Sequence, residues 1–306
     1  CALPIYFSVS SSGKYLFCKE LSLSLVATKV SADILYDMFE IVEAQAWVKA
    51  HLDEFSDLWN ICDHRNEQVF LKELIKEFVI LDSVKERNAY RDLSAKITAW
   101  ALSPENTWIV AACNDMEIDG SVAAMQKLKN KLDPYDDWHL RMLPSIPSGA
   151  KSIQNGDVVV LFDDFIGSGG KLITKAEWLT KLLSKKGVEH FTLYYMSVAG
   201  MRFGCERIAD ETGREVFTAL SLDRAISDKY EPEVADEYKL LMLGLEQKLH
   251  ESYKNKRIKD YSFGFSKSEA LYCVENDNCP NNVFPVFWWA KLKSGDSFRT
   301  LLRRAG

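Results

Sequence analysis

The sequence predicts an α/β protein with a parallel sheet, a helical region before the sheet and a loop-rich segment after it. From about residue 105, short apolar segments alternate with helical patterns, as is typical of βαβ units. Before that point, residues 31–100 repeat apolar side chains at spacings of three and four, which predicts helices. After about residue 263 neither periodicity persists, and aromatic residues accumulate among loop formers.

The bulk composition is that of a soluble globular chain. Its 306 residues are 47% hydrophobic and 27% charged, which suits one large domain or two small ones. The net charge of −6, without a dense basic run, argues against direct nucleic-acid binding. No apolar run approaches the roughly 18 residues of a membrane helix, so we expect no membrane association. Seven cysteines without a CxxC pair indicate reduced thiols and a cytoplasmic location.

We expect a division near residue 104. Residues 1–104 form the N-terminal helical region, whose helices pack on the core or on a partner, and residues 105–306 form the α/β domain. The chain begins at Cys1 rather than Met, and the mixed, Ser-rich stretch of the first 30 or so residues is expected to be a truncated or artefactual start.

The elements of the α/β domain follow in order along the chain. A buried strand at 107–113 precedes a helix at 121–132, and residues 133–156 are a Pro- and Gly-containing excursion with at most one short strand. Strands at 158–162, 190–200 and 214–222 alternate with helices at 172–186 and 204–212. A helical insertion is expected at about 225–260. Right-handed crossovers place the loops after parallel strands at one edge, where ligands bind.

Two acids, Asp163 and Asp164, directly follow the most strand-like segment. Ionised carboxylates are costly to bury, and neighbouring acids raise each other's pKa, so both are expected to lie outside the core. A ligand with two adjacent hydroxyl groups would donate hydrogen bonds to them. A divalent cation would also relieve their repulsion, and Mg²⁺ is the usual ion for few carboxylates plus phosphate. The sequence offers no other cluster with metal-ligand spacing.

The turn after the acids has the opposite electrostatic character. Gly167, Gly169 and Gly170 permit positive φ, so that successive N–H groups can converge on one anion. This point lies at the start of a helix, whose dipole adds positive potential, while Ser168 offers a hydroxyl and Lys171 a cation. Acids for sugar hydroxyls beside a nest for phosphate fit a ribose 5-phosphate.

The segment resembles the phosphoribosyl-diphosphate motif of type I phosphoribosyltransferases. That pattern is an apolar strand, two acids, two further residues, then Thr/Ser, Thr/Ser, Gly, Gly and Thr. Asp163 and Asp164 match the acids that hold the ribose, so the resemblance assigns them the catalytic positions. Gly167 replaces a usual hydroxyl residue and Lys171 replaces the last Thr. The backbone cradle survives both changes, and Lys171 can replace the lost contact with a charge.

More of the chain is similar to the PRTase-CE branch, the phosphoribosyltransferase-like domains of bacterial conflict systems. The similarity is carried by "VLFDDFIGSGG", "DMEIDGS", "YYMSVAGM" and "CPNNVFPVFWW", and runs from about Gln68 to the end. It implies a phosphoribosyltransferase-like core under a C-terminal hood. It further implies a phosphoribosyl diphosphate or nucleotide ligand, reaction at the anomeric carbon, and a part in phage defence together with partner proteins.

The resemblance also implies a pyrophosphate-type loop at Asp119, Gly120 and Ser121. Gly120 and Ser121 can offer backbone donors at a helix start. With Asp115 and Glu117, however, this loop carries three acids that repel pyrophosphate unless a cation lies between them. The ligand is then either accompanied by a metal ion or is not phosphoribosyl diphosphate.

The hood segment supplies the expected base or ribose contacts, Asn281, Asn282 and Trp288. The asparagines donate and accept hydrogen bonds, and the indole offers a flat face for a base. The alternative is a loop whose Asn side chains bond its own backbone.

Several other interpretations compete with the ribose-phosphate site. One is a strand-end turn without a ligand. A P-loop NTPase is disfavoured because "FIGSGGKL" lacks the first glycine of GxxxxGK, and a phosphorylated receiver domain would not need the glycine turn. The alternative to an enzyme is a non-catalytic nucleotide sensor that signals to partner proteins, which the acidic loop favours somewhat.

Overall fold

The computed structural model describes residues 31–305. The expectation about the start of the chain therefore falls outside the described residues. Contacts divide the chain before Glu40, and residues 40–306 form one compact unit, to which the sheet, the cavity and all contacts below belong.

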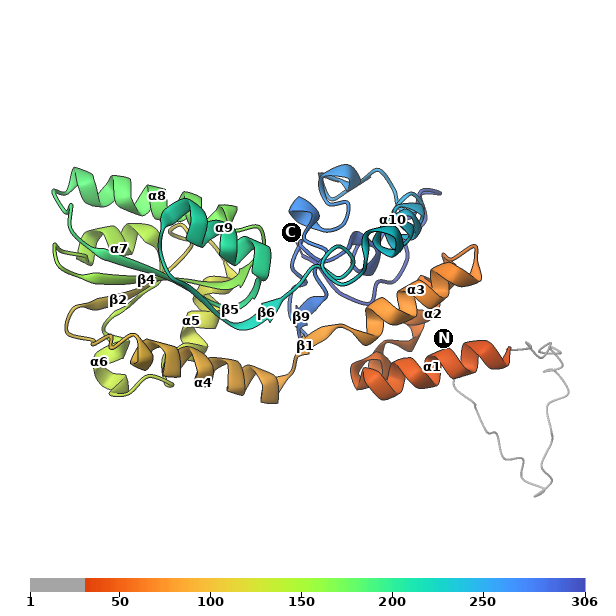
Figure 1. The fold of residues 1–306 in the computed structure, drawn as a ribbon, viewed down its shortest axis with the longest axis horizontal. Coiled ribbons are helices and arrows are strands. Elements are labelled where there is room, and N and C mark those ends of the chain that lie inside the picture. Colours follow the sequence, from red (N-terminus) through yellow and green to blue (C-terminus); the bar gives the residue numbers. More distant parts are fainter. Residues whose placement is uncertain (1–30, 306) are drawn as a thin grey trace, which may run out of the picture. The chain divides into compact units, whose positions relative to one another are not determined.

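Five parallel strands form the central sheet, in the order β3, β2, β4, β5, β6 (Figure 1). They are β2 (Thr107–Ala111), β3 (Met142–Leu143), β4 (Val158–Ile166), β5 (Thr192–Met201) and β6 (Val216–Leu222). Consecutive residues of β4, such as Val159, Val160 and Leu161, are all fully buried. Both faces of the sheet are therefore covered, which explains the unbroken apolar run. The predicted α/β class is confirmed.

Helices cover both faces of this sheet, as Figure 1 shows. One side carries α7 (Ile146–Ser152), α8 (Gly170–Lys185) and α9 (Arg202–Thr212), and their apolar residues form one core with alternate residues of β4. On the other side lie α4 (Ser83–Ala99) and α5 (Gly120–Leu128), and the short α6 (Tyr135–His139) precedes β3. The helix–strand alternation expected from residue 105 to residue 222 is thus observed.

Strand β4 is longer than the sequence indicated. The apolar run stops at Phe162, yet the strand continues through both acids to Ile166. Pairing with β5 sustains it, with Asp163 opposite Ser197 and Ile166 opposite Gly200. The acids are therefore part of the sheet, and their backbone positions are set by strand pairing rather than by a loop.

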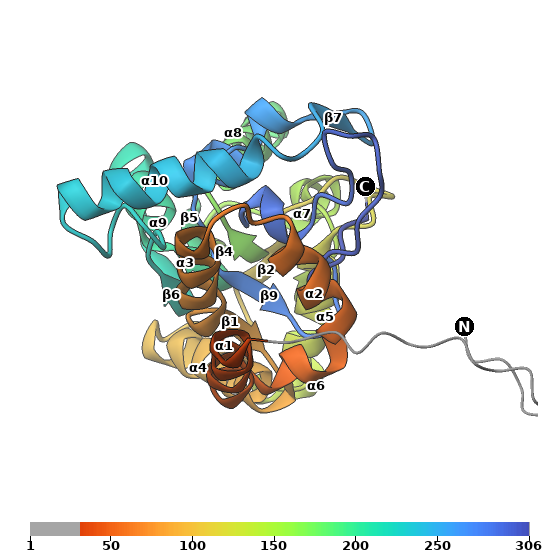
Figure 2. The same ribbon diagram turned by 90° about the vertical axis from the view of Figure 1, so that its right-hand side faces the viewer.

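The N-terminal segment is helical, as expected, apart from one strand. It contains α1 (Ala32–Ala44), a 3₁₀ turn (Ala46–His51), α2 (Leu52–Asn60) and α3 (Arg65–Lys76) before α4. Strand β1 (Val79–Leu81) lies between α3 and α4 and pairs in parallel with β9 (Tyr272–Val274) (Figure 2). Residues on both sides of residue 104 therefore contribute to the unit of residues 40–306.

The end of the chain is loop-rich, as expected. Helix α10 (Pro232–Glu246) is shorter than the predicted insertion at 225–260, and a small hairpin of β7 (Ser252–Tyr253) and β8 (Lys256–Arg257) follows it. Three 3₁₀ turns, Ile258–Asp260, Phe265–Lys267 and Pro285–Phe287, lie in the segment that we call the hood, residues 258–305. In the described residues, no helix combines the length and apolar character that crossing a membrane requires.

Candidate ligand-binding site

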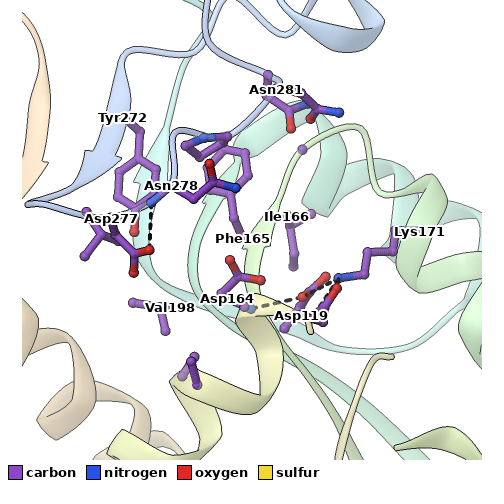
Figure 3. Close-up of a pocket in the computed structure, with 18 of the residues that line it drawn as sticks. Asp119, Asp164, Phe165, Ile166, Lys171, Val198, Tyr272, Asp277, Asn278 and Asn281 are labelled. Atoms are coloured by element: carbon purple, nitrogen blue, oxygen red, sulfur yellow. Dashed lines mark hydrogen bonds and ion pairs between the residues drawn. The ribbon is translucent and has the colours of Figure 1, made fainter. Parts of the chain in front are cut away.

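A cavity of about 720 Å³ lies beside the end of β4, between the sheet and the hood. Figure 3 shows side chains from β4, α5, α8 and the hood around it. The lining includes most of the residues predicted from sequence: Asp119, Gly120, Asp163, Asp164, Gly167, Ser168, Gly169, Lys171, Asn281 and Asn282.

Asp163 is at the floor of the cavity and is 1% exposed. Its Oδ1 accepts hydrogen bonds from Lys171 Nζ at 2.9 Å and from the backbone N–H of Asp164 at 3.1 Å. Its Oδ2 has no hydrogen-bond partner among the described residues. Burial raises the pKa of Asp163 well above its usual range; Lys171 opposes this shift and Asp164 adds to it. The expectation that neither acid is buried is therefore wrong for Asp163, because Lys171 folds back onto it.

Asp164 is half-buried and points into the cavity beside Asp119 (Figure 3). The backbone of Gly120, the first residue of α5, packs directly on its carboxylate. A Cβ at residue 120 would lie 2.2 Å from Asp164 Oδ2, which no real contact allows. Gly120 thus brings the start of a helix, with its positive dipole end, against an acid that faces the ligand space.

Asp119 completes an acidic cluster with Asp163 and Asp164. One oxygen from each of the three carboxylates lies within 4.8 Å of the others, so the described residues do contain a group that could hold a metal ion. The sequence analysis found only the adjacent pair, because Asp119 comes from the loop after β2. Asp119 also caps α5, accepting the Ser121 N–H at 2.9 Å.

Lys171 connects this acidic cluster to the glycine turn. Its Nζ lies 2.9 Å from Asp163 Oδ1 and 3.1 and 3.2 Å from the two oxygens of Asp119. Burial works against the ammonium group, but the two acids outweigh it and raise the pKa of Lys171. Burial likewise opposes the charge of Asp119, but Lys171 and the hydrogen bond from the Ser121 N–H hold the pKa of Asp119 below its usual range.

The turn of residues 167–171, which we call the phosphate loop, leads into α8. Only one of its glycines has positive φ: Gly169, the N-cap, at +80°. Gly170 already has the right-handed conformation of α8. Gly167 is needed for close approach instead, since a Cβ there would lie 2.3 Å from Asn282 Nδ2. On the other side Gly204 of α9 packs on the carbonyl oxygen of Gly167, so the loop is clamped between the hood and α9.

The hood residues have different roles from those expected. Asn281 lines the cavity. Asn282 is also in the lining, but its Nδ2 donates to Ser268 Oγ at 2.8 Å and to the Phe265 carbonyl at 3.3 Å, so its hydrogen bonds join two segments of the hood. Trp288 is 2% exposed, donates from Nε1 to the Val283 carbonyl, and is not among the cavity-lining side chains of residues 31–305. A base contact by Trp288 is therefore excluded: its indole packs among the hood aromatics instead.

Ser121 and Gly170 also lie outside the cavity lining. Ser121 is fully buried, and its Oγ has no hydrogen-bond partner among the described residues. Its side chain therefore offers nothing to a ligand, although Gly120 beside it does line the cavity.

The sequence analysis missed an aromatic wall opposite the phosphate loop. Phe165 and Tyr272 stack with ring centroids 5.1 Å apart and planes 9° from parallel. Phe165 fills a free position of the motif, so no sequence signal marks it. Further lining residues that the sequence analysis missed come from α4, from the end of β1 and from the hood, among them Leu81, Glu86, Tyr90, Val274, Asp277, Asn278 and Arg304. They reach the cavity through the pairing of β1 with β9, which sequence periodicity did not reveal.

The cavity holds more acidic than basic side chains. Two of its lysines are already paired, Lys127 with Glu86 at 2.6 Å and Lys175 with Glu117 at 3.7 Å. Lys171 is shared between two acids. Such a site favours a ligand that donates hydrogen bonds to carboxylates, and it repels a bare polyphosphate. The groups of this lining that can bind an anion are the phosphate loop at the start of α8 and the guanidinium of Arg304.

Comparison with known proteins identifies one matching protein family and several solved structures that are distantly similar. No curated protein matches the sequence. The orotate phosphoribosyltransferase from Aeropyrum pernix aligns over 43% of this chain and 68% of its own, with 15% identity and a TM-score of 0.29. The APRTase from Giardia lamblia, solved with 9-deazaadenine, aligns over 45% and 80%, with 13% identity and a TM-score of 0.31.

A hypothetical protein from Neisseria gonorrhoeae with bound ppGpp aligns over 53% of this chain and 96% of its own, with 12% identity and a TM-score of 0.32. By sequence, the PRTase-CE family matches residues 48–304, so the similarity begins before Gln68, where the sequence motifs predicted its start. The match spans most of the chain and includes the acids of β4, the phosphate loop and the hood, and so the chain belongs to the PRTase-CE family.

Proposed function

We propose that this protein binds a ligand containing ribose 5-phosphate, either a nucleotide or phosphoribosyl diphosphate, and acts at its anomeric carbon. One observation carries the proposal. Asp164 opens into the cavity next to a glycine turn that starts α8, so an acceptor for sugar hydroxyls and a donor site for phosphate lie side by side. Family membership supports the same class of ligand.

The lining orients such a ligand. The 5′-phosphate binds the N–H groups of residues 167–171, where the α8 dipole adds positive potential. The ribose hydroxyls donate to Asp164, and the partnerless Oδ2 of Asp163 is a second acceptor at the cavity floor. A base then extends toward the Phe165–Tyr272 wall, where Asn281 and Asn278 offer amide groups.

The chemistry at the anomeric carbon needs positioning more than proton transfer. Breaking the glycosidic bond leaves an oxocarbenium-like centre, which nearby carboxylates stabilise electrostatically. Asp164, which opens into the cavity, supplies that negative potential from a fixed strand, β4. The family association implies Mg²⁺, and Asp119, Asp163 and Asp164 have the spacing of a metal site, but Lys171 Nζ already contacts two of these three acids at 2.9–3.2 Å.

The alternative function is a non-catalytic sensor that binds a nucleotide and signals to partner proteins. The loop between β2 and α5 favours it, because Asp115, Glu117 and Asp119 oppose the binding of pyrophosphate as a leaving group. Met116 and Ile118 on this loop are fully exposed, and Ile118 also lines the cavity, so a partner protein that contacts this loop would sense whether the site is occupied. A place in a bacterial conflict or phage-defence system, with partner proteins, belongs to the proposal through the family association alone.

Calorimetry with ribose 5-phosphate, phosphoribosyl diphosphate and nucleoside monophosphates tests the proposal, with product release followed by chromatography. Asp164→Asn should lower affinity by roughly 10- to 150-fold, the loss of one charged hydrogen bond of about 1.5–3 kcal/mol. Asp210→Asn, a change at an exposed acid of α9, is the matched control and should leave affinity unchanged. Binding without turnover supports the sensor, and failure of every ligand to bind refutes both functions.

A further inference from the structure

Lys171 occupies an unusual place in this site. It is the last residue of the phosphate loop and the second residue of α8, while its ammonium group lies among carboxylates from two other places in the chain. The group contacts both oxygens of Asp119 at 3.1 and 3.2 Å (Figure 3) and Asp163 Oδ1 at 2.9 Å. It is thus a positive charge shared by two of the three clustered acids.

The spacing of these acids is that of a cation's coordination shell. Oxygens opposite one another around Mg²⁺ are about 4 Å apart, and around Ca²⁺ about 5 Å. The clustered oxygens of Asp119, Asp163 and Asp164 lie within 4.8 Å of one another. A divalent ion placed among them would come close to the position of Lys171 Nζ, and the two cations would repel strongly at that distance.

A second observation shows that the cluster is not satisfied by protein groups alone. Asp163 is 1% exposed, and its Oδ2 is buried without a hydrogen-bond partner among residues 31–305. A buried carboxylate oxygen in this condition is costly and calls for a donor or a cation from a ligand. Lys171 reaches Oδ1 but leaves Oδ2 open.

We propose that Lys171 is a built-in counterion that takes the place of a divalent cation, so that the protein binds its ribose-phosphate ligand without a metal ion. Asp119, Asp163 and Asp164 then form a divalent-cation site only when the ammonium group is removed. The statement about the ligand rests on the proposed function, whereas the statement about metal binding does not.

Because Lys171 lies at the phosphate loop, its replacement of a metal ion also affects ligand binding. The ammonium group lowers the net negative charge of the acids that face the sugar, and it does so from the first turn of the helix that binds the phosphate. A cation that neutralises both partners is what a metal ion would supply beside a phosphate. The covalent attachment of Lys171 makes this charge available at every metal concentration.

Titration of the purified, chelator-treated full chain with Mn²⁺, following free Mn²⁺ by EPR, tests the metal half. Lys171→Met keeps the length of the side chain and removes its charge. The variant should bind about one Mn²⁺ at least tenfold more tightly than the parent, and adding Asp119→Asn should abolish the gain. Lys175→Met is the matched control, since Lys175 lies one turn along α8, lines the same cavity and contacts none of the three acids; it should behave as the parent.

Ribose 5-phosphate binding with EDTA and with Mg²⁺ tests the ligand half. The parent should differ less than about threefold between the two conditions, while Lys171→Met should lose at least tenfold in EDTA and recover with Mg²⁺. The inference is overturned if the parent and Lys171→Met bind Mn²⁺ with equal affinity, or if Lys171→Met binds no Mn²⁺. It is also overturned if Lys175→Met gains as much Mn²⁺ affinity as Lys171→Met, or if the parent needs Mg²⁺ to bind ribose 5-phosphate.

The Mn²⁺ titration and the ribose 5-phosphate measurement also distinguish failure of this inference from failure of the proposed function. If no form of the protein binds ribose 5-phosphate, the proposed function fails and the Mn²⁺ titration still decides the role of Lys171. If Lys171→Met does not fold, as judged by circular dichroism, Lys171→Gln replaces it. The comparison of EDTA with Mg²⁺ in the parent needs no variant.

Discussion

Substituting Gly120 should weaken ligand binding while leaving the stability of the protein nearly unchanged. In Gly120→Ala the new methyl group would lie 2.2 Å from Asp164 Oδ2 and 2.5 Å from its Cγ, where ordinary contacts exceed 3.4 Å. The carboxylate can rotate into the cavity, at an off-rotamer cost of about 0.5–1.5 kcal/mol. Alanine in a helix gains up to about 1 kcal/mol over glycine. These two effects nearly cancel, so the melting temperature should change by no more than about 3 °C.

Ligand affinity should fall much further, because the displaced carboxylate no longer meets the sugar. The loss of one charged hydrogen bond, about 1.5–3 kcal/mol, corresponds to roughly 10- to 150-fold weaker binding of ribose 5-phosphate by calorimetry. Gly244→Ala is the matched control: it lies in α10, where a Cβ meets only Glu67 Oε1 at an ordinary 3.7 Å. It should melt at the same or a higher temperature and bind normally. Unchanged affinity in Gly120→Ala would refute the placement of Asp164 on the ligand.

Two further predictions concern stability. Gly204→Ala would place a Cβ 1.9 Å from the backbone oxygen of Gly167, and no side-chain rotation relieves this overlap. We expect the free energy of unfolding to fall by about 1–3 kcal/mol and the melting temperature by roughly 2–12 °C. An unchanged melting curve would contradict the close packing of α9 on the phosphate loop. Glu246 is 4% exposed, and burial raises its pKa from 4.5 to about 7 against hydrogen bonds from Ser262 Oγ and the Phe263 N–H. The native state therefore binds more protons than the unfolded chain between about pH 4.5 and 7, so the unfolding free energy should fall by roughly 3 kcal/mol as pH rises through that window. Urea unfolding at pH 5 and pH 8 should show a fall that is larger in the parent than in Glu246→Gln by about this amount; equal pH dependence in both would show that the Glu246 carboxyl titrates normally.

The strand, acids and glycine turn of residues 156–171 could be predicted because each signal is local. A strand covered on both faces needs an unbroken apolar run, and the run at 158–162 provided it. A turn that enters a helix through positive φ needs a glycine, and Gly169 occupies that position. The parallel sheet followed from the alternation of strands with helices. These features depend on neighbours within a few residues, so periodicity and composition report them.

The chemical state of the site could not be predicted in this way. Asp163 is buried because β4 continues into pairing with β5 and because Lys171 returns to it from α8. Asp119 joins the cluster from the loop after β2. Trp288 is a residue type that can stack on a base, yet its indole packs inside the hood and does not line the cavity. In each case the deciding contact comes from a residue distant in the chain or from a face that periodicity does not identify.

The sequence by itself determined the parallel α/β core, the acid pair and the phosphate loop, because strand burial, turn conformation and helix start are properties of short segments. Only the tertiary structure decided which acid is open to a ligand and which cation balances the acidic cluster. It also decided that β1, from the N-terminal helical segment, pairs with β9 of the hood to build the far wall of the cavity. Burial and charge pairing depend on contacts between distant residues, and those contacts exist only once the chain has folded.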